Sequence, residues 1–385
     1  MDKKQNDREL GARVAELRKR RGLSQKDLAQ AAGFKFAQVL CDLEAGKRAL
    51  KATELVRLAS FFGVPATAIL TGELASAAQR VLWRGAEGSA TPFREREEQV
   101  FLTRCRRYAF LERLAGHEPK GAMPSFEPPK DLRRLAFEEV GSWADKAREM
   151  LSLGARPALS LREALEGEWG IKIFFSPLQG GSALTARGDF GSGICLRGGE
   201  PAWRVHFSLA HELFHLLTWE GTPPSDAPAP TRSKNRTETL ADVFASRLLL
   251  PVTALDPFIN SLRTEKGARG MAILEAAHEF GVSVEAVVWR MVNLDVLSRE
   301  EAQKLLLDGR LKVLDRGRRP CEACHEPAIP QRFVFLAVRC FLAGKISRGK
   351  LAELMETTVG DLGHDLDQHG YDLDSDAYEA KIVSA

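Results

Sequence analysis

The first seventy residues alternate short amphipathic segments with helix breakers. Leu10, Val14 and Leu17 recur at helical spacing, so they share one face of a predicted helix. Ser24 precedes the next amphipathic segment as a helix N-cap, and Gly33 then interrupts the pattern. The pattern predicts a compact all-α domain of five short helices, over residues 6–21, from Ser24 to Gly33, and over about 35–44, 51–62 and 65–71.

The pattern changes beyond this domain. RGAEGSATPF (84–93) reads as a linker, residues 94–115 form a predicted helix dense in charges of both signs, and 116–131 is a proline-rich spacer. The β-branched and aromatic run IKIFFSPL (171–178) predicts a strand. Further strands are expected near 182–187 and 190–196, helices at 138–152, 160–169, 203–218 and 237–250, and mostly helix over 256–385.

These elements predict an α+β fold that is predominantly helical, with a small sheet. A chain of 385 residues is too long for one ordinary domain. We expect a five-helix domain at 6–73, a linker and charged helix at 74–135, a mixed domain at 136–300 and a helical C-terminal region at 301–385.

Composition indicates the cellular compartment that suits the protein and shows that its N-terminal part is basic. The chain is 44% hydrophobic and 28% charged, and its formal charge of +3 is too small to identify a partner. Residues 1–50 carry twelve Lys and Arg against seven Asp and Glu, so this end is locally basic. We expect no signal peptide and no membrane segment, because no apolar run approaches eighteen residues. Six scattered cysteines make a disulfide framework improbable and fit a reducing cytoplasm.

The sequence HELFH, from His211 to His215, indicates a metal site on the helix expected at 203–218. Residues four apart lie on one face of a helix, so the imidazoles of His211 and His215 can converge on one ion. Glu212 is rotated by about 100° from His211 and suits a general base acting on a water molecule. His206 and Arg204, just upstream, are weaker candidates for donors to a developing oxyanion.

The next strong helix supplies the expected third ligand. Glu238 and Asp242 are also four residues apart, so one can ligate the ion while the other holds a ligand histidine through its second nitrogen. Two histidines and one carboxylate with an open position are typical of catalytic rather than structural zinc. Two alternatives stay open: a pair of partly buried histidines without metal, and a metal site that cleaves nothing.

These residues resemble the ImmA/IrrE family of zinc metallopeptidases. FSLAHELFHLLTW is followed by ETLADVFASRLLLP (238–251), which fits that family's second motif. The resemblance implies that His211, His215 and Glu238 bind Zn²⁺, that Glu212 is the catalytic acid/base, and that Asp242 supports a ligand. It also implies cleavage of a repressor protein in a stress or mobile-element response. One departure is CLRGGEPAW before the helix, where relatives often carry an asparagine-rich turn.

The N-terminal domain resembles an XRE-type, phage-repressor-like helix-turn-helix. By that resemblance Gln25 lies near a DNA phosphate, and the helix at 35–44 enters the major groove. Lys35 and Gln38 are then candidate base contacts, and Lys47 and Arg48 candidate phosphate contacts. The interval from Gly33 to Leu43 is one residue longer than in the commonest form of the motif. The residues that carry the resemblance are Leu17, Gly22 to Gln25, Leu28, Ala29, Gly33, Leu43, Glu44, Gly46 and Val64.

Three weaker patterns remain. Cys321, Cys324 and His325 indicate either a second zinc site, completed by Cys340, or unpaired thiols in a loop. The segment 280–294 reads as a helix-turn-helix fragment or, since it is rich in valine, as core. The segment 344–354 reads as a packing or partner surface.

Together these patterns predict a cytoplasmic, DNA-binding transcriptional regulator with a zinc-dependent endopeptidase domain. Its expected partners are a double-stranded operator, a protein substrate of the XRE-type repressor class, and a second copy of the chain. The second copy is expected because such domains commonly read two-fold operators. The alternatives are a transcription factor or antitoxin-like regulator whose peptidase-like domain only senses or dimerises, and a helix-turn-helix used for protein contact.

Overall fold

The structure is a computed structural model and divides into two compact units, the head (Met1–Gln79) and the body (Arg80–Ala385). No helix among the described residues is both long and apolar enough to cross a bilayer. The residues that the structure describes are 3–20, 23–34, 36–62, 66–71, 80–84, 92–117, 119, 121–129, 134–179, 181–221, 236–264, 269–318 and 327–371.

The head has the five helices predicted from the hydrophobic pattern. Ser24 caps the second helix in a capping box with Asp27, as its position before the apolar segment predicts. The first helix approaches the third so closely that a Cβ at Gly11 would clash with the carbonyl oxygen of Leu43. The helices are α1 (Lys3–Arg20), α2 (Gln25–Ala31), α3 (Ala37–Glu44), α4 (Ala52–Phe62) and α5 (Ala66–Thr71).

The faces of these helices enclose one small core. Leu10, Val14 and Leu17 are buried, which confirms the face predicted for α1. They pack with buried side chains of the other four helices, including Leu28, Leu40, Leu58 and Ile69.

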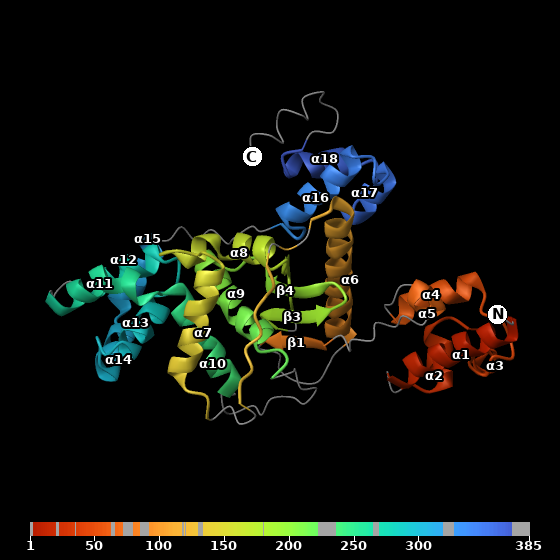
Figure 1. Cartoon of the computed structure of the whole chain (residues 1–385), viewed down its shortest axis with the longest axis horizontal. Coiled ribbons are helices and arrows are strands. Elements are labelled where there is room, and N and C mark those ends of the chain that lie inside the picture. Colours follow the sequence, from red (N-terminus) through yellow and green to blue (C-terminus); the bar gives the residue numbers. More distant parts are fainter. Residues whose placement is uncertain are drawn as a thin grey trace. The chain divides into compact units, whose positions relative to one another are not determined.

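The body is built on one four-stranded sheet in the order β1-β3-β4-β2 (Figure 1). β1 pairs antiparallel with β3, β3 antiparallel with β4, and β4 parallel with β2. The strands are β1 (Arg80–Arg84), β2 (Lys172–Ser176), β3 (Ala183–Gly188) and β4 (Gly191–Arg197). β2 lies in the β-branched and aromatic run that predicts a strand, and β3 and β4 lie near 182–187 and 190–196, where further strands were expected.

The first strand corrects the expected domain organisation. Arg80–Arg84 lies in the segment 74–135, which we expected to be a linker followed by a charged helix, yet it forms an edge of the sheet. The charged helix, α6 (Pro92–Ala115), packs on the same sheet through buried Phe101 and Tyr108. A five-residue strand with arginine at both ends carries too short an alternation to be distinguished from a linker.

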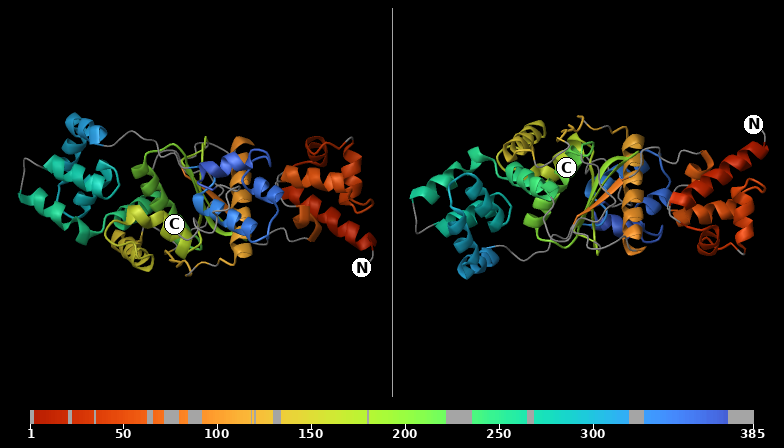
Figure 2. Two further views of the ribbon diagram at one scale, coloured as in Figure 1. Left: turned by 90° about the horizontal axis from the view of Figure 1, so that it is seen from above. Right: turned by 90° about the horizontal axis from the view of Figure 1, so that it is seen from below.

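Two hydrophobic cores cover the two faces of the sheet, because successive strand residues point to opposite sides. Ile173 and Phe175 belong to the core beneath α9, whereas Phe174 belongs to the core beneath α6. Both further views show α6 along one face (Figure 2). The helices of the first core are α7 (Phe137–Met150), α8 (Pro157–Glu168), α9 (Ala202–Leu217) and α10 (Arg236–Leu249).

The rest of the chain is helical in its described parts, as expected. Val282, Val287, Val288 and Met291 are fully buried, so the valine-rich segment at 280–294 is core. The helices that complete the first core are α11 (Val252–Thr264), α12 (Arg269–Glu279), α13 (Val284–Asn293) and α14 (Arg299–Leu307). α15 (Gly309–Arg318) contacts α12 and α14.

The last helices add to the core beneath α6. Leu351, Ala352 and Leu354 are buried there, so the segment 344–354 is a packing surface. Cys340 is also buried in this core, while Cys321, Cys324 and His325 lie outside the described residues. The helices are α16 (Gln331–Leu342), α17 (Arg348–Leu354) and α18 (Leu362–Gln368).

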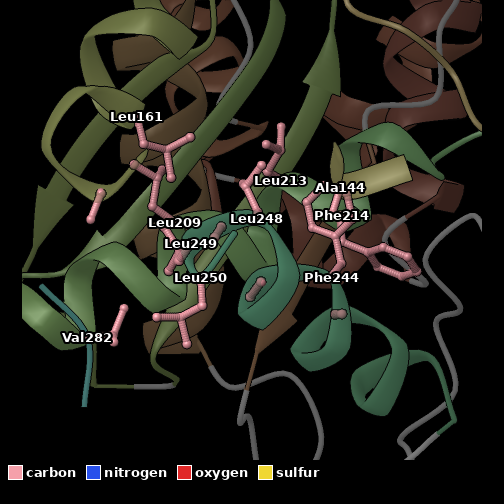
Figure 3. Close-up of a cluster of buried hydrophobic side chains, with 14 of the residues drawn as sticks. Ala144, Leu161, Leu209, Leu213, Phe214, Phe244, Leu248, Leu249, Leu250 and Val282 are labelled. Carbon is pink, nitrogen blue, oxygen red and sulfur yellow. The ribbon is translucent and has the colours of Figure 1, made fainter. Parts of the chain in front are cut away.

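Packing between α9 and α10 positions the two helices that carry the candidate metal ligands. Leu209, Leu213 and Phe214 from α9 meet Phe244 and Leu248 from α10 in one buried cluster (Figure 3). The rings of Phe214 and Phe244 lie 5.7 Å apart, within the range of favourable aromatic pairs. This packing holds the histidines of α9 beside the carboxylates of α10.

Candidate metal centre

The two histidines of HELFH lie on one face of α9, in the interior of the body. His211 is 1% exposed and His215 is 5% exposed. Their Nε2 atoms are 3.2 Å apart, as the spacing of four residues on a helix predicts. Two unprotonated ring nitrogens at this distance repel each other unless a proton or a cation lies between them.

Glu238 from α10 closes the group. Its Oε2 lies 3.2 Å from Nε2 of His211, and its Oε1 lies 3.4 Å from Nε2 of His215. In a tetrahedral zinc site with bonds of about 2.0–2.1 Å, neighbouring ligand atoms lie about 3.3 Å apart. The three side chains therefore fit one zinc ion in both chemistry and spacing. Within the described part of the chain, these three form the group of three or more His, Cys, Asp or Glu side chains whose ligand atoms lie close enough together to hold one metal ion.

Asp242 lies one turn further along α10 and contacts the other side of His211. Its Oδ1 is 2.9 Å from Nδ1 of that ring. The spacing left open which of the two carboxylates would ligate, and the family resemblance implied Glu238. In the structure Glu238 faces both Nε2 atoms, and Asp242 faces Nδ1. Carboxylates in the latter position fix the tautomer and orientation of a ligand histidine.

These contacts set the charge of the site. Burial opposes ionisation of Glu238, but hydrogen bonds with His211 and His215 outweigh burial and hold the pKa of the carboxyl well below its usual range. Burial lowers the pKa of His211, and the nearby charge of Arg84 acts in the same direction. Hydrogen bonds with Asp242 and Glu238 outweigh both, so the net pKa of His211 is raised.

Glu212 is fully buried and is held by a residue of the sheet. The hydroxyl of Thr185 on β3 donates to its Oε2 at 2.7 Å. Its Oε1 is buried with no hydrogen-bond partner among the described residues. A buried carboxylate oxygen without a donor is costly and therefore calls for an explanation; an oxygen kept free to accept a proton from a water molecule is one.

A cleft of about 750 Å³ is lined by His211, Glu238 and Asp242. Glu238 and Asp242 remain 33% and 24% exposed, so the group is open on one side. The other residues lining the cleft include Arg84 of β1, Ser208 of α9 and three aromatic side chains, Trp203, Phe207 and Trp289.

The two upstream candidates for oxyanion donors occupy different positions. His206 is tied to the body, because its Nδ1 lies 2.9 Å from the carbonyl oxygen of Gly281. Arg204 lines the cleft but lies 3.7 Å from Glu200 in an ion pair and over the ring of Trp203. Sequence reasoning missed Thr185 and Arg84, since neither belongs to a local motif.

Some of the candidate DNA-contacting side chains of the head are exposed, whereas others pair with carboxylates of the head itself. Lys47 is exposed, and Gln38 is exposed while donating to Asp42. Gln25 donates to Glu44 at 2.8 Å, and Arg48 pairs with Glu54 at 3.1 Å. Lys35 lies outside the described residues, as do Gly22 and Val64 of the helix-turn-helix pattern. These contacts stay predictions.

Comparisons with solved structures give only remote likeness. PlcR from Bacillus thuringiensis, in complex with the peptide PapR7 and DNA, is 12% identical, with 98% of this chain and 100% of that chain covered and a TM-score of 0.16. The apo form of ComR from S. thermophilus is 11% identical, with the same coverage and TM-score. These TM-scores are too low to indicate a common overall fold. No curated protein matches the chain.

Family models match two separate parts of the chain. Residues 9–70 match a helix-turn-helix domain, and this match covers the five helices of the head except the ends of α1 and α5. Residues 167–292 match the IrrE N-terminal-like domain of the Peptidase M78 family, from the end of α8 through α13. The second match contains every residue of the candidate metal centre. The chain therefore joins a segment that matches a helix-turn-helix domain to a segment that matches the IrrE N-terminal-like domain of the Peptidase M78 family.

Proposed function

We propose that the protein is a DNA-binding regulator whose body is a zinc-dependent endopeptidase, with a repressor protein as the expected substrate class. The observation that carries the proposal is the fit of His211, His215 and Glu238 to one tetrahedral ion on the wall of an open cleft. A structural zinc site is closed by four protein ligands, whereas this group offers three and leaves one position for water or substrate.

Zinc bound by these three residues would supply a Lewis acid that acidifies water and polarises a carbonyl group. Oε1 of Glu212 is the base that accepts a proton from the attacking water. The water oxygen forms a bond to the carbonyl carbon, Glu212 passes the proton to the leaving nitrogen, and the C–N bond breaks. Thr185 holds the other oxygen of Glu212, so the carboxylate keeps one orientation through both transfers.

The head supplies the proposed DNA contacts. Gln38 and Lys47 are exposed on and after α3, the helix expected to enter the major groove. We propose that Gln38 contacts a base and that Lys47, with Arg48 and Gln25, contacts phosphates, on a two-fold operator read by a homodimer. A titration at about 50 mM salt that detects no DNA binding, or binding without a salt slope, contradicts this assignment.

The test of the peptidase is incubation of the zinc-loaded chain with candidate XRE-type repressors, followed by mass spectrometry of the products. Glu212→Gln keeps the shape of the side chain and removes the base, so we expect it to retain zinc and to lose cleavage. Glu220→Gln is the matched control, because Glu220 is an exposed residue paired with Arg187. Cleavage that survives Glu212→Gln contradicts the mechanism.

A chain that binds zinc and DNA but cleaves none of the repressors would point to the other reading, a body that senses or dimerises without turnover.

A further inference from the structure

One arginine of the cleft comes from outside the segment that matches the peptidase family. Arg84 is the last residue of β1, the edge strand of the sheet, and its side chain lines the cleft together with His211 and Glu238. The family match begins only at residue 167. β1 therefore brings a positive charge to the cleft from outside the segment that matches the family.

Ser208 ties this arginine to the helix of the metal ligands. Nη1 of Arg84 donates to the hydroxyl of Ser208 at 3.1 Å. Ser208 is 5% exposed and lies three residues before His211, so it shares the face of α9 that carries the histidines. This hydrogen bond uses one of five guanidinium N–H groups and leaves the others able to reach a ligand.

The guanidinium of Arg84 is not held in an ion pair in the described part of the chain, although Glu200, Glu238 and Asp242 line the same cleft. No carboxylate of the described residues forms an ion pair with it, whereas Arg204 in the same cleft pairs with Glu200 and Arg187 on β3 pairs with Glu220. A half-buried guanidinium without a carboxylate ion-pair partner among the described residues is suited to an anionic ligand.

We infer that Arg84 is a further catalytic residue, which donates hydrogen bonds to the oxygen of the scissile carbonyl as that oxygen gains negative charge. The inference rests on the proposed peptidase function. Arg84 makes and breaks no covalent bond in this step; it stabilises charge that forms when the water oxygen adds to the carbonyl carbon. Ser208 holds the guanidinium in place beforehand, so little reorganisation is needed during the reaction.

The inference also defines the ligand class, which is a peptide whose reacting carbon becomes a tetrahedral, anionic centre. A suitable probe is phosphoryl-leucyl-tryptophan, whose tetrahedral phosphoryl oxygens carry the charge. Acetohydroxamate is the reference probe, because it chelates the metal without presenting a tetrahedral anion. The readout is the dissociation constant of each probe by calorimetry on the zinc-loaded full chain, with zinc content measured alongside.

We expect Arg84→Gln to weaken binding of the phosphoryl probe about 100-fold, while acetohydroxamate affinity and zinc content stay unchanged. Arg84→Lys keeps the positive charge but lacks the forked arrangement of N–H donors. Its affinity for the phosphoryl probe should lie between those of the wild type and Arg84→Gln. Arg187→Gln is the matched control on the same sheet and should bind like the wild type. Equal phosphoryl affinity in the wild type and Arg84→Gln overturns the inference.

A second variant covers the case in which Arg84→Gln loses zinc or unfolds. Ser208→Ala leaves Arg84 intact and removes its tether, so we expect about 5- to 10-fold weaker binding of the phosphoryl probe alone. Wild-type affinity in Ser208→Ala, after failure of Arg84→Gln, also overturns the inference. A wild-type chain that binds neither probe contradicts the proposed function itself, so the two failures are distinguishable.

Discussion

Oδ1 of Asp242 lies 2.9 Å from Nδ1 of His211, and this contact turns the opposite nitrogen of the ring toward Glu238 and His215. Two carboxylates one helical turn apart thus act on the two sides of one imidazole. The arrangement requires α10 to present both Glu238 and Asp242 to α9, which the packing of Phe244 and Leu248 against α9 enforces.

Asp242→Asn should weaken zinc binding by about 10- to 100-fold, because an amide orients the His211 ring less strongly than a carboxylate does. The measurement is competition with a chelator of known zinc affinity. Asp256→Asn, a substitution of an exposed aspartate on α11, is the control and should leave zinc affinity unchanged. Unchanged affinity in Asp242→Asn would show that this carboxylate does not support the ligand.

Zinc binding should release protons near neutral pH. In the metal-free protein, hydrogen bonds with Asp242 and Glu238 raise the pKa of His211 above 6.5 despite burial, and zinc binds only the neutral ring. Zinc affinity should therefore weaken as pH falls through the raised pKa. Calorimetry in buffers of different ionisation enthalpy measures the protons released, and a value of zero at about pH 7 would contradict this assignment.

The same pKa shift predicts how the metal-free protein responds to pH. A raised pKa means that protonation of His211 stabilises the folded state. That contribution is fully present below the unfolded pKa of about 6.5 and is lost as pH rises through the folded value. Zinc-loaded protein should not show this loss, and parallel thermal melts of the two forms across this window would reveal the difference.

Thr185→Val should lower the rate of cleavage by about 10-fold or more, because it leaves a second oxygen of the fully buried Glu212 without a donor. Thr185→Ser keeps the hydroxyl and should restore most of the rate. Zinc content should be the same in both variants, since Thr185 does not contact the ligands in the structure. A valine variant with the wild-type kcat would remove Thr185 from the account.

Glu44→Ala should destabilise the head by about 2 kcal/mol. Glu44 is 5% exposed along its side chain and accepts hydrogen bonds from Arg18 at 2.7 and 2.9 Å and from Gln25 at 2.8 Å, so it joins α1, α2 and α3. Glu44→Gln keeps part of this network and should cost less. Hydrogen exchange of the head amides in the full chain is the measurement, and unchanged protection would contradict the role of Glu44.

Much of the metal centre could be predicted from the sequence because its parts are local. A spacing of four on a helix is enough to place His211 beside His215, and Glu238 beside Asp242. The spacing alone does not decide which carboxylate ligates, since both lie on the same face of α10, whereas the resemblance to the ImmA/IrrE family implies Glu238. The choice depends on the depth at which α9 and α10 pack, and Leu213, Phe214 and Phe244 determine that depth.

Thr185 and Arg84 could not be predicted because their contacts are purely tertiary. Thr185 meets Glu212 only because β3 pairs with β4 and lies against α9. Arg84 meets Ser208 across 124 positions of sequence, through a strand too short to recognise. The hydrophobic pattern identifies helices and strands of ordinary length. Contacts made by residues at the ends of short strands can be recognised only in the assembled sheet.

The most direct test of the metal centre is X-ray absorption at the zinc edge of the loaded full chain. Two imidazole nitrogens and oxygen ligands, at about 2.0–2.1 Å and with no sulfur, are predicted from His211, His215 and Glu238. His215→Ala should remove one imidazole contribution. A sulfur shell at about 2.3 Å would place the zinc on cysteines instead and contradict the account.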